Sequence, residues 1–221
     1  MKIFKYLLAA ALAFTATAAS AQMHETDDYT RLQASFTIGS LSNSGVPSID
    51  PNGFSLGVIQ GINVVEHLPV FVEIGATLNW MHSAADYYNL IDPKDRGDRK
   101  YTNMNIAIPV NGVYKFAIND IVSINAHAGL NLKVNFFANE KVNGEKINYL
   151  KKDDMGGRDN RGNVFQLGGQ VGLGVNIKQI YIGYQYQTDF MKLVKWPVSG
   201  EKYFLHNNYI TVGFTGDFFE F

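Results

Sequence analysis

Apolar and polar residues alternate along most of the chain, in eight segments of about ten residues each. The clearest segment runs from Val122 to Phe136, where every second residue is apolar and the residues between are Ser, Asn, His, Gly and Lys. A two-residue repeat is typical of a β-strand, because a helix would spread the same apolar residues around its axis. The sequence therefore predicts an all-β protein, with strands over residues 32–38, 54–64, 70–80, 104–116, 122–136, 165–177, 180–190 and 210–218.

The connections between the predicted strands alternate between long and short. Their lengths are 12, 5, 18, 4, 25, 2 and 16 residues, so all long loops lie at one end and all tight turns at the other. Outer-membrane barrels have this plan, with short periplasmic turns and longer external loops, and eight is their smallest strand number. We therefore predict an eight-stranded antiparallel up-and-down transmembrane β-barrel. The connections are Leu41–Asn52, Val65–Pro69, Ser83–Lys100, Ile118–Ile121, Ala138–Gly162, Lys178–Gln179 and Met191–His206.

The composition of the two strand faces indicates which one is outside. The apolar face carries no charged residue, as expected if it meets lipid, where a lysine or arginine at the bilayer centre costs about 2–4 kcal/mol. The polar face consists mostly of Asn, Gln, Gly, Ser and Thr, whereas a water-exposed surface is about a quarter to a third charged. The alternative is a soluble periplasmic barrel of the lipocalin type, whose apolar face would line a pocket for a hydrophobic ligand.

The first 21 residues have the three parts of a secretory signal peptide. Met1–Lys5 carries two lysines, Tyr6–Ala19 is apolar, and Ala19-Ser20-Ala21 is a small-residue cleavage site. The apolar run is shorter than the roughly 20 residues that a spanning helix needs. We predict cleavage after Ala21, a periplasmic tail over residues 22–30, and a barrel over residues 31–221 in the outer membrane of a Gram-negative bacterium.

Composition excludes several classes of protein. The chain has 221 residues, a formal charge of −1 and no cysteine. The lack of cysteine rules out disulfides, thiolate zinc sites, a cysteine nucleophile and a lipid anchor on cysteine. The near-neutral charge argues against nucleic-acid binding, which usually requires a basic stripe.

Aromatic residues gather near both ends of the predicted strands, as in the two interfacial girdles of membrane barrels. The alternative explanation is the general enrichment of aromatic residues in strands. The chain resembles outer-membrane barrels in ending with an aromatic residue, Phe221, which the insertion machinery reads in such proteins, although the regular alternation runs through Phe218 instead. The girdle residues are Trp80, Tyr101, Phe136, Phe137, Phe165, Tyr186, Phe190 and Tyr209 at the long-loop end, and Phe71, Tyr114, Phe116, Phe218, Phe219 and Phe221 at the other.

A second resemblance concerns the fourth predicted strand. Its sequence, Ile106-Ala-Ile-Pro-Val-Asn-Gly-Val-Tyr-Lys-Phe116, is similar to the Ile-Pro strand of the PorT-like outer-membrane β-barrel families common in Bacteroidota, and Glu73-x-Gly75 in the preceding strand fits the same pattern. The resemblance implies a fold and a location but no activity. Pro109 removes a hydrogen bond from the strand ladder, and we expect a local defect there.

Charged residues on the polar face would lie inside the barrel. Buried unpaired charge is costly, so ion pairs with additional hydrogen bonds are the expected arrangement. An eight-stranded interior is just filled by side chains, which leaves a narrow channel as an alternative and argues against a general porin. The predicted interior charges are Arg31, Glu73, Lys115, His127, Lys133, Asp189 and Asp217.

A lipid-modifying enzyme is the catalytic alternative, since some eight-stranded outer-membrane barrels use a His with a Ser and an acid near the external rim. His82, Ser83 and Asp86 lie close in sequence, but adjacent strand residues point to opposite faces, and a base must reach its nucleophile. His206 near Tyr209 is no stronger a candidate. We therefore predict no catalytic residues.

The two longest loops mix acidic and basic residues. Asp92, Asp95 and Asp98 recur every third residue, but neither this run nor the acidic residues of 153–160 has the spacing of a calcium loop. A solvated loop is the better interpretation, so we predict no metal and no cofactor.

The predicted function is a structural or adhesin-like role through the external loops 83–100 and 138–162. The expected partners are outer-membrane lipid and lipopolysaccharide, the barrel-insertion machinery, and an external protein or glycan bound by these loops; nucleic acid is not among them. The alternatives are the lipid-modifying enzyme, the narrow channel and the soluble carrier of a hydrophobic ligand.

Overall fold

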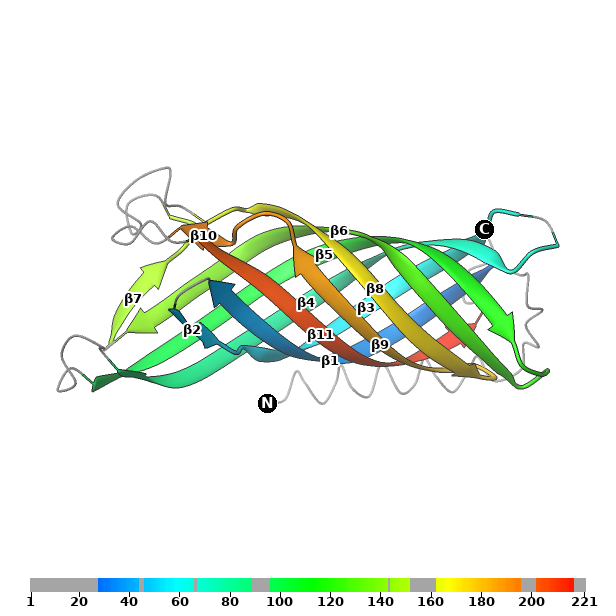
Figure 1. The fold of residues 1–221 in the computed structure, drawn as a ribbon, viewed down its shortest axis with the longest axis horizontal. Coiled ribbons are helices and arrows are strands. Elements are labelled where there is room, and N and C mark those ends of the chain that lie inside the picture. Colours follow the sequence, from blue (N-terminus) through cyan, green and yellow to red (C-terminus); the bar gives the residue numbers. More distant parts are fainter. Residues whose placement is uncertain are drawn as a thin grey trace.

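The computed structural model describes residues 28–43, 46–65, 67–88, 96–142, 144–151, 162–195 and 202–216, and these form one antiparallel sheet that curls into a cylinder (Figure 1). Among the described residues, no helix has the length and apolar character to cross a membrane. The strands are β1 (Tyr29–Asn43), β2 (Val46–Ile49), β3 (Asn52–Asn63), β4 (Val70–Tyr88), β5 (Arg96–Ala117), β6 (Val122–Val142), β7 (Glu145–Asn148), β8 (Phe165–Ile177), β9 (Ile180–Asp189), β10 (Val194–Lys195) and β11 (Lys202–Gly216).

Eight of the described strands close the barrel, because the first and last of them are hydrogen-bonded neighbours, from Thr30 opposite Gly216 to Ser42 opposite Phe204. This confirms the predicted fold class. Following the paired residues once around the barrel leads back to β1 ten residues further on, a stagger that tilts the strands by roughly 40°. The path runs Thr30, Gln60, Ile74, Val110, Leu130, Gly169, Thr188, His206 and Ser40.

Burial alternates with a period of two, and the apolar residues are the exposed ones. Phe54 and Leu173 are 56% and 60% exposed, whereas the Asn, Gln and Ser residues between such positions are buried. An apolar belt on the outside of a barrel is stable only in lipid. The apolar side chains face hydrocarbon there instead of water, so they do not need to be buried in a protein core. This arrangement is the reverse of a soluble calyx, so the predicted alternative of a periplasmic carrier is wrong.

The strands at the long-loop end extend further than the alternation predicted. β4 continues to Tyr88, β5 begins at Arg96 and β6 runs to Val142, all inside the predicted loops Ser83–Lys100 and Ala138–Gly162. Beyond the lipid a strand meets water on its outer face, so its residues need not alternate and the sequence signal disappears. The short strands β2, β7 and β10 pair at this same end (Figure 1).

Two irregularities interrupt the ladders of β5. At Pro109 the pairs that Gly75 and Ala76 would make with β5 are missing, and pairing with β4 resumes in the same register, as expected for a local defect. The second is a β-bulge in β6, where Asn105 pairs with Asn135 but Met104 pairs with Phe137. One extra residue, Phe136, reverses which residues of β6 point outward from there on.

Candidate functional site

The interior at the short-turn end is built around one ion pair. Arg31 of β1 donates to Glu73 of β4 through Nη1 and Nη2, at 2.7 and 3.0 Å, and Tyr29 donates its hydroxyl to the same carboxylate at 2.6 Å. The guanidinium also lies over the Tyr181 ring, 4.1 Å from its centroid. Lys115 is buried beside the Tyr29 ring, with Nζ 5.8 Å from its centroid. The cluster therefore spans the lumen between strands that are not neighbours in the sheet.

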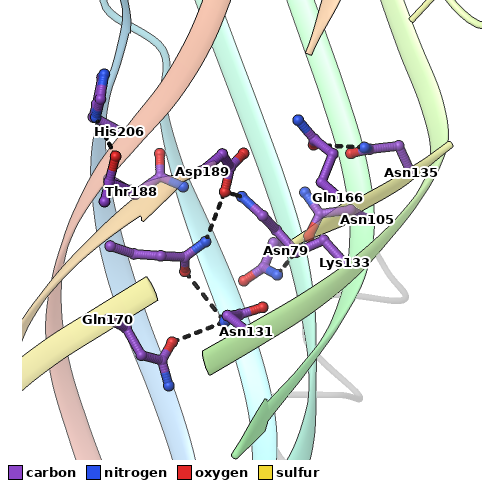
Figure 2. A network of polar contacts seen from close by, with 12 residues as sticks. Asn79, Asn105, Asn131, Lys133, Asn135, Gln166, Gln170, Thr188, Asp189 and His206 are labelled. Carbon is purple, nitrogen blue, oxygen red and sulfur yellow. Dashed lines mark hydrogen bonds and ion pairs between the residues drawn. The ribbon is translucent and has the colours of Figure 1, made fainter. Parts of the chain in front are cut away.

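Side-chain amides fill the middle of the lumen (Figure 2). Gln170 donates to Asn111 at 2.5 Å, accepts from Asn131 at 2.9 Å and accepts from Gln185 at 3.1 Å. His127 contacts Gln185, with Nε2 3.1 Å from Oε1. A cavity of about 30 Å³ remains between these side chains. It holds about one water molecule and no larger ligand.

A second ion pair lies further toward the long-loop end. Lys133 Nζ is 2.6 Å from Asp189 Oδ1, and both side chains have no solvent exposure. Gln187 donates to the same carboxylate oxygen at 3.4 Å and accepts from Asn131 at 3.3 Å, which links the pair to the amide layer (Figure 2). The two charges are thus paired through Oδ1, as low-dielectric surroundings require, whereas Asp189 Oδ2 has no hydrogen-bond partner among the described residues.

Apolar side chains close the barrel at the long-loop end. We refer to this group as the mouth cluster. Two of its members, Tyr149 and Leu193, come from the connections rather than from the barrel wall, and backbone bonds hold these connections together: Tyr149 N donates to Ala138 O at 2.8 Å and Asn163 N donates to Leu193 O at 3.0 Å. The Tyr149 hydroxyl donates to Glu140 inside the mouth. The members are Met81, Tyr101, Ala138, Tyr149, Leu193 and Leu205.

The structure places the predicted interior residues in these layers. Arg31 and Glu73 lie together at the short-turn end, Lys133 and Asp189 lie together nearer the mouth, and Lys115 and His127 are buried in the lumen. Alternation predicted which face each residue occupies, but which interior charges become partners depends on the register between the strands. Asp217 lies outside the described residues.

Most of the predicted aromatic girdle lies on the outer wall, but three members do not. Tyr101, Tyr209 and Phe71 are buried inside the barrel, so their assignment to the girdle is wrong. Each is an odd-numbered residue on a strand whose even-numbered residues face outward, and proximity to a strand end does not override that alternation. Phe218, Phe219 and Phe221 lie outside the described residues, and the outward-facing members are Trp80, Tyr114, Phe116, Phe136, Phe137, Phe165, Tyr186 and Phe190.

The rim histidines lie on the outer wall. His82 contacts Thr102, with Nδ1 3.0 Å from Oγ1, and stacks on Trp80 at a centroid distance of 6.1 Å. Ser83 is buried on the opposite face of β4, so His82 and Ser83 do not form a base and nucleophile pair.

His206 contacts residues of the neighbouring strand β9 rather than Tyr209. Its Nδ1 lies 2.8 Å from Thr188 Oγ1 and 3.3 Å from the Tyr186 hydroxyl, whereas Tyr209 points inward. The register between β9 and β11 brings Thr188 next to His206, and no spacing in the sequence could have indicated this contact. Within the described residues, no carboxylate hydrogen-bonds to His82 or His206 and no group of three acidic or histidine side chains is placed to hold a metal ion.

A closed eight-stranded barrel with an apolar belt, aromatic residues near both rims and a filled polar lumen defines the class of outer-membrane β-barrels. The family described as "Outer membrane protein beta-barrel domain" matches residues 7–218, and the chain belongs to this family. It is accordingly a protein of the outer membrane.

Three solved structures are similar to the chain. Ail, the attachment invasion locus protein of Yersinia pestis, is 16% identical with a TM-score of 0.44, over 86% of this chain and 99% of Ail. Neisserial surface protein A is 15% identical with a TM-score of 0.48, over 86% of this chain and 97% of that one. OprG of Pseudomonas aeruginosa is 12% identical with a TM-score of 0.44, over 89% of this chain and 99% of OprG. A search of curated proteins found no match.

Proposed function

We propose that this protein is a small, non-catalytic outer-membrane barrel with a structural or adhesin-like role, exerted through its long external loops. The Ile106–Phe116 motif supports a place among the PorT-like barrels of Bacteroidota, which are Gram-negative bacteria. Residues 1–21 support export by a cleaved signal peptide.

The observation that carries the proposal is the closed mouth of the barrel. The connections after β7 and after β9 turn inward, so that Tyr149 and Leu193 pack over the lumen with less than 2% of their surface exposed. Burial of two such side chains contributes about 2 kcal/mol each. The described residues thus close the mouth over the lumen, which favours a role at the outer surface of the barrel over passage through it.

The competing functions have weaker support. A narrow channel requires a continuous water path, but the described side chains of the lumen form two ion pairs and leave between the amides a cavity of about 30 Å³. A hydrolytic enzyme requires a base, a nucleophile and an orienting acid, and the described contacts of His206 provide a hydroxyl without the acid.

Replacing two loop segments tests the proposal. Residues 152–161 can be replaced by a short Gly-Ser linker, since Gly162 N already donates to Tyr149 O at 2.7 Å. Residues 89–95 can be replaced by Asn-Gly, because Tyr88 and Arg96 are register partners and a two-residue turn suits a hairpin. A wider deletion over residues 139–161 would remove Glu140 and Tyr149 and open the mouth.

The readout is adhesion of bacteria that display the protein to a panel of immobilised matrix proteins and glycans. We expect wild-type cells to adhere to at least one member of the panel and the loop-replaced variants to lose that adhesion. The control carries the same Gly-Ser linker between Asn119 and Asp120, in a turn at the opposite end. Adhesion that survives both replacements, or no adhesion above that of cells lacking the protein, would overturn the proposal.

A further inference from the structure

Three polar residues interrupt the apolar belt on the outer wall of β9 and β11. Thr188 of β9 and His206 of β11 are register partners, and Figure 2 shows the contact between their side chains. Asn208 follows two residues further along β11, so it points to the same outer side. All three are half-buried, and we refer to them as the polar inlet. The outward-facing neighbours along the two strands are exposed: Ile210 and Val212 on β11, and Tyr184, Tyr186 and Phe190 on β9.

The polar inlet lies within the apolar belt and not above it. Ile38 of β1 is the register partner of Asn208, and on the other side Leu167 of β8 accepts a backbone hydrogen bond from Phe190. With strands tilted by roughly 40°, each residue advances about 2.5 Å along the barrel axis, so Leu167 and Phe190 stand about 4 and 7 Å further out than Asn208. Ile38, Leu167 and Phe190 are all exposed. Apolar side chains therefore flank the inlet at its own height and beyond it.

Two nitrogen atoms of the polar inlet lack a hydrogen-bond partner among the described residues. The Tyr184 hydroxyl donates to Asn208 Oδ1 at 2.6 Å. His206 Nδ1 lies 2.8 Å from Thr188 Oγ1 and 3.3 Å from the Tyr186 hydroxyl. These contacts do not involve Asn208 Nδ2 or His206 Nε2. Hydrocarbon offers no water to satisfy such groups, so their partner has to come from outside the barrel.

The chemistry of the polar inlet favours a neutral partner that both donates and accepts hydrogen bonds. The inlet contains an amide, a hydroxyl and an imidazole, and none of its side chains is a carboxylate, a lysine or an arginine. A phosphate group would require cationic donors for tight binding. An amide donor beside a hydroxyl acceptor is instead complementary to a second copy of itself.

The outer faces of β9 and β11 also match each other in height and size. A two-fold axis along the membrane normal relates two copies without changing the height of any residue, and it brings one surface patch against the same patch of the other copy. With the axis between the two strands, β9 of each copy faces β11 of the other. Residues at matching heights, within about 2 Å, then meet, and each tyrosine of β9 meets a smaller aliphatic residue of β11. The pairs are Thr188 with Asn208, Tyr186 with Ile210, and Tyr184 with Val212.

We propose that two copies of this chain form a symmetric dimer in the outer membrane through the outer faces of β9 and β11. In the dimer, Asn208 Nδ2 of each copy donates to Thr188 Oγ1 of the other, and the tyrosines below pack against Ile210 and Val212. The closed ladder leaves no sheet edge in this part of the barrel, so side chains alone make the contact. The interface lies on the wall and goes beyond the proposed role of the loops.

Disulfide cross-linking tests the predicted contact, since the chain has no cysteine of its own. Tyr186→Cys protein and Ile210→Cys protein are reconstituted together in phosphatidylcholine vesicles and oxidised with copper phenanthroline. We expect the mixture to give far more cross-linked dimer than either variant alone, because the axis places Tyr186 of one copy against Ile210 of the other. The matched control is Leu78→Cys mixed with Ile108→Cys, an exposed pair with the same offset on β4 and β5, on the opposite wall. Equal cross-linking of the two mixtures would overturn the proposal.

Energy transfer in the same vesicles measures the strength of the dimer. The fluorophores are attached to Asp120→Cys, in an exposed turn at the short-turn end, and the lipid-to-protein ratio is raised until the dimer dissociates. Asn208→Leu removes both symmetric hydrogen bonds and should weaken the dimer about tenfold. Gln60→Leu is the control, because Gln60 is a half-buried polar residue on the outer face of β3, and it should leave the dissociation constant unchanged.

Three outcomes of this measurement would overturn the dimer, whatever the adhesion assay shows. The first is a wild type without energy transfer at any dilution, which would assign the polar inlet to a different component of the membrane. The second is equal dissociation constants for the wild type and Asn208→Leu, and the third is an equal loss in Gln60→Leu. Gel mobility before and after boiling checks that every variant is folded.

Discussion

Arg31 and Glu73 form a two-pronged ion pair across the lumen, with Nη1–Oε1 and Nη2–Oε2 distances of 2.7 and 3.0 Å. They lie on β1 and β4, which are separated in the barrel by β3, so the pair joins two parts of the wall that share no backbone hydrogen bond. The Tyr29 hydroxyl donates to the Glu73 carboxylate, and the Arg31 guanidinium lies over the Tyr181 ring. The pair therefore braces the barrel at its short-turn end.

Breaking this pair from one side should be costly. Glu73→Gln leaves the Arg31 guanidinium buried without a counter-charge and should lower the free energy of unfolding by about 3–5 kcal/mol. The double variant Arg31→Met/Glu73→Leu should lose less than the single one, because it leaves no buried charge. Urea unfolding in lipid vesicles, followed by tryptophan fluorescence, measures both. Equal losses in the two variants would contradict the brace.

Two glycines of neighbouring strands should respond differently to alanine. A Cβ on Gly129 of β6 would overlap the carbonyl oxygen of Val110 and lie 2.6 Å from Asn111 Oδ1, so Gly129→Ala should cost about 1–3 kcal/mol. Gly112 of β5 faces outward, and the heavy atom nearest to a Cβ added there would be the Ala128 carbonyl oxygen at 3.9 Å. Gly112→Ala is the matched control and should change stability by less than about 0.5 kcal/mol. Urea midpoints in the same vesicles compare the two.

The closed mouth predicts an electrically silent barrel. In planar bilayers the wild type should give no stepwise conductance, and Lys133→Ala/Asp189→Ala should remain silent, because the mouth cluster still covers the lumen. A known pore added to the same bilayer serves as the positive control. Discrete openings of the wild type would contradict the closed mouth and favour the narrow channel.

The rim histidines should be dispensable for lipid chemistry. His206 contacts Thr188 and Tyr186 on the outer wall, where no orienting carboxylate is described. The mass spectrum of lipid A from cells expressing the wild type should therefore equal that from cells expressing His206→Ala or His82→Ala. A species present with the wild type and absent with His206→Ala would show that the pair is catalytic.

Alternation predicted the faces of the barrel because lipid imposes a strict rule on every second residue. Applied by itself, the same rule places Tyr101 and Tyr209 inside the barrel. Their position near a strand end does not change which face they occupy. The rule applies only to the part of each strand whose outer face meets lipid. For that reason the sequence did not indicate that β4 reaches Tyr88 or that β7 pairs with β6.

Partnerships between distant side chains were beyond sequence reasoning. Lys133 and Asp189 were both predicted to lie inside. The predicted interior has three acids and four bases, so 11 other acid–base pairs were equally compatible with the faces alone until the register of β6, β8 and β9 was known. The bulge at Phe136 was also beyond the sequence, because no hydrophobic pattern after it reveals the change of phase.

The pairing of β1 with β11 has a consequence for how other chains can attach. A closed ladder abolishes sheet edges within the membrane, so no partner strand can join the barrel there. Among the described strands, the remaining edges are those of β2, β7, β10 and the part of β4 beyond His82, all at the long-loop end. Within the part of the chain that the structure describes, attachment by β-strand addition, in which a peptide extends a sheet through main-chain hydrogen bonds, is therefore open at the long-loop end of the barrel.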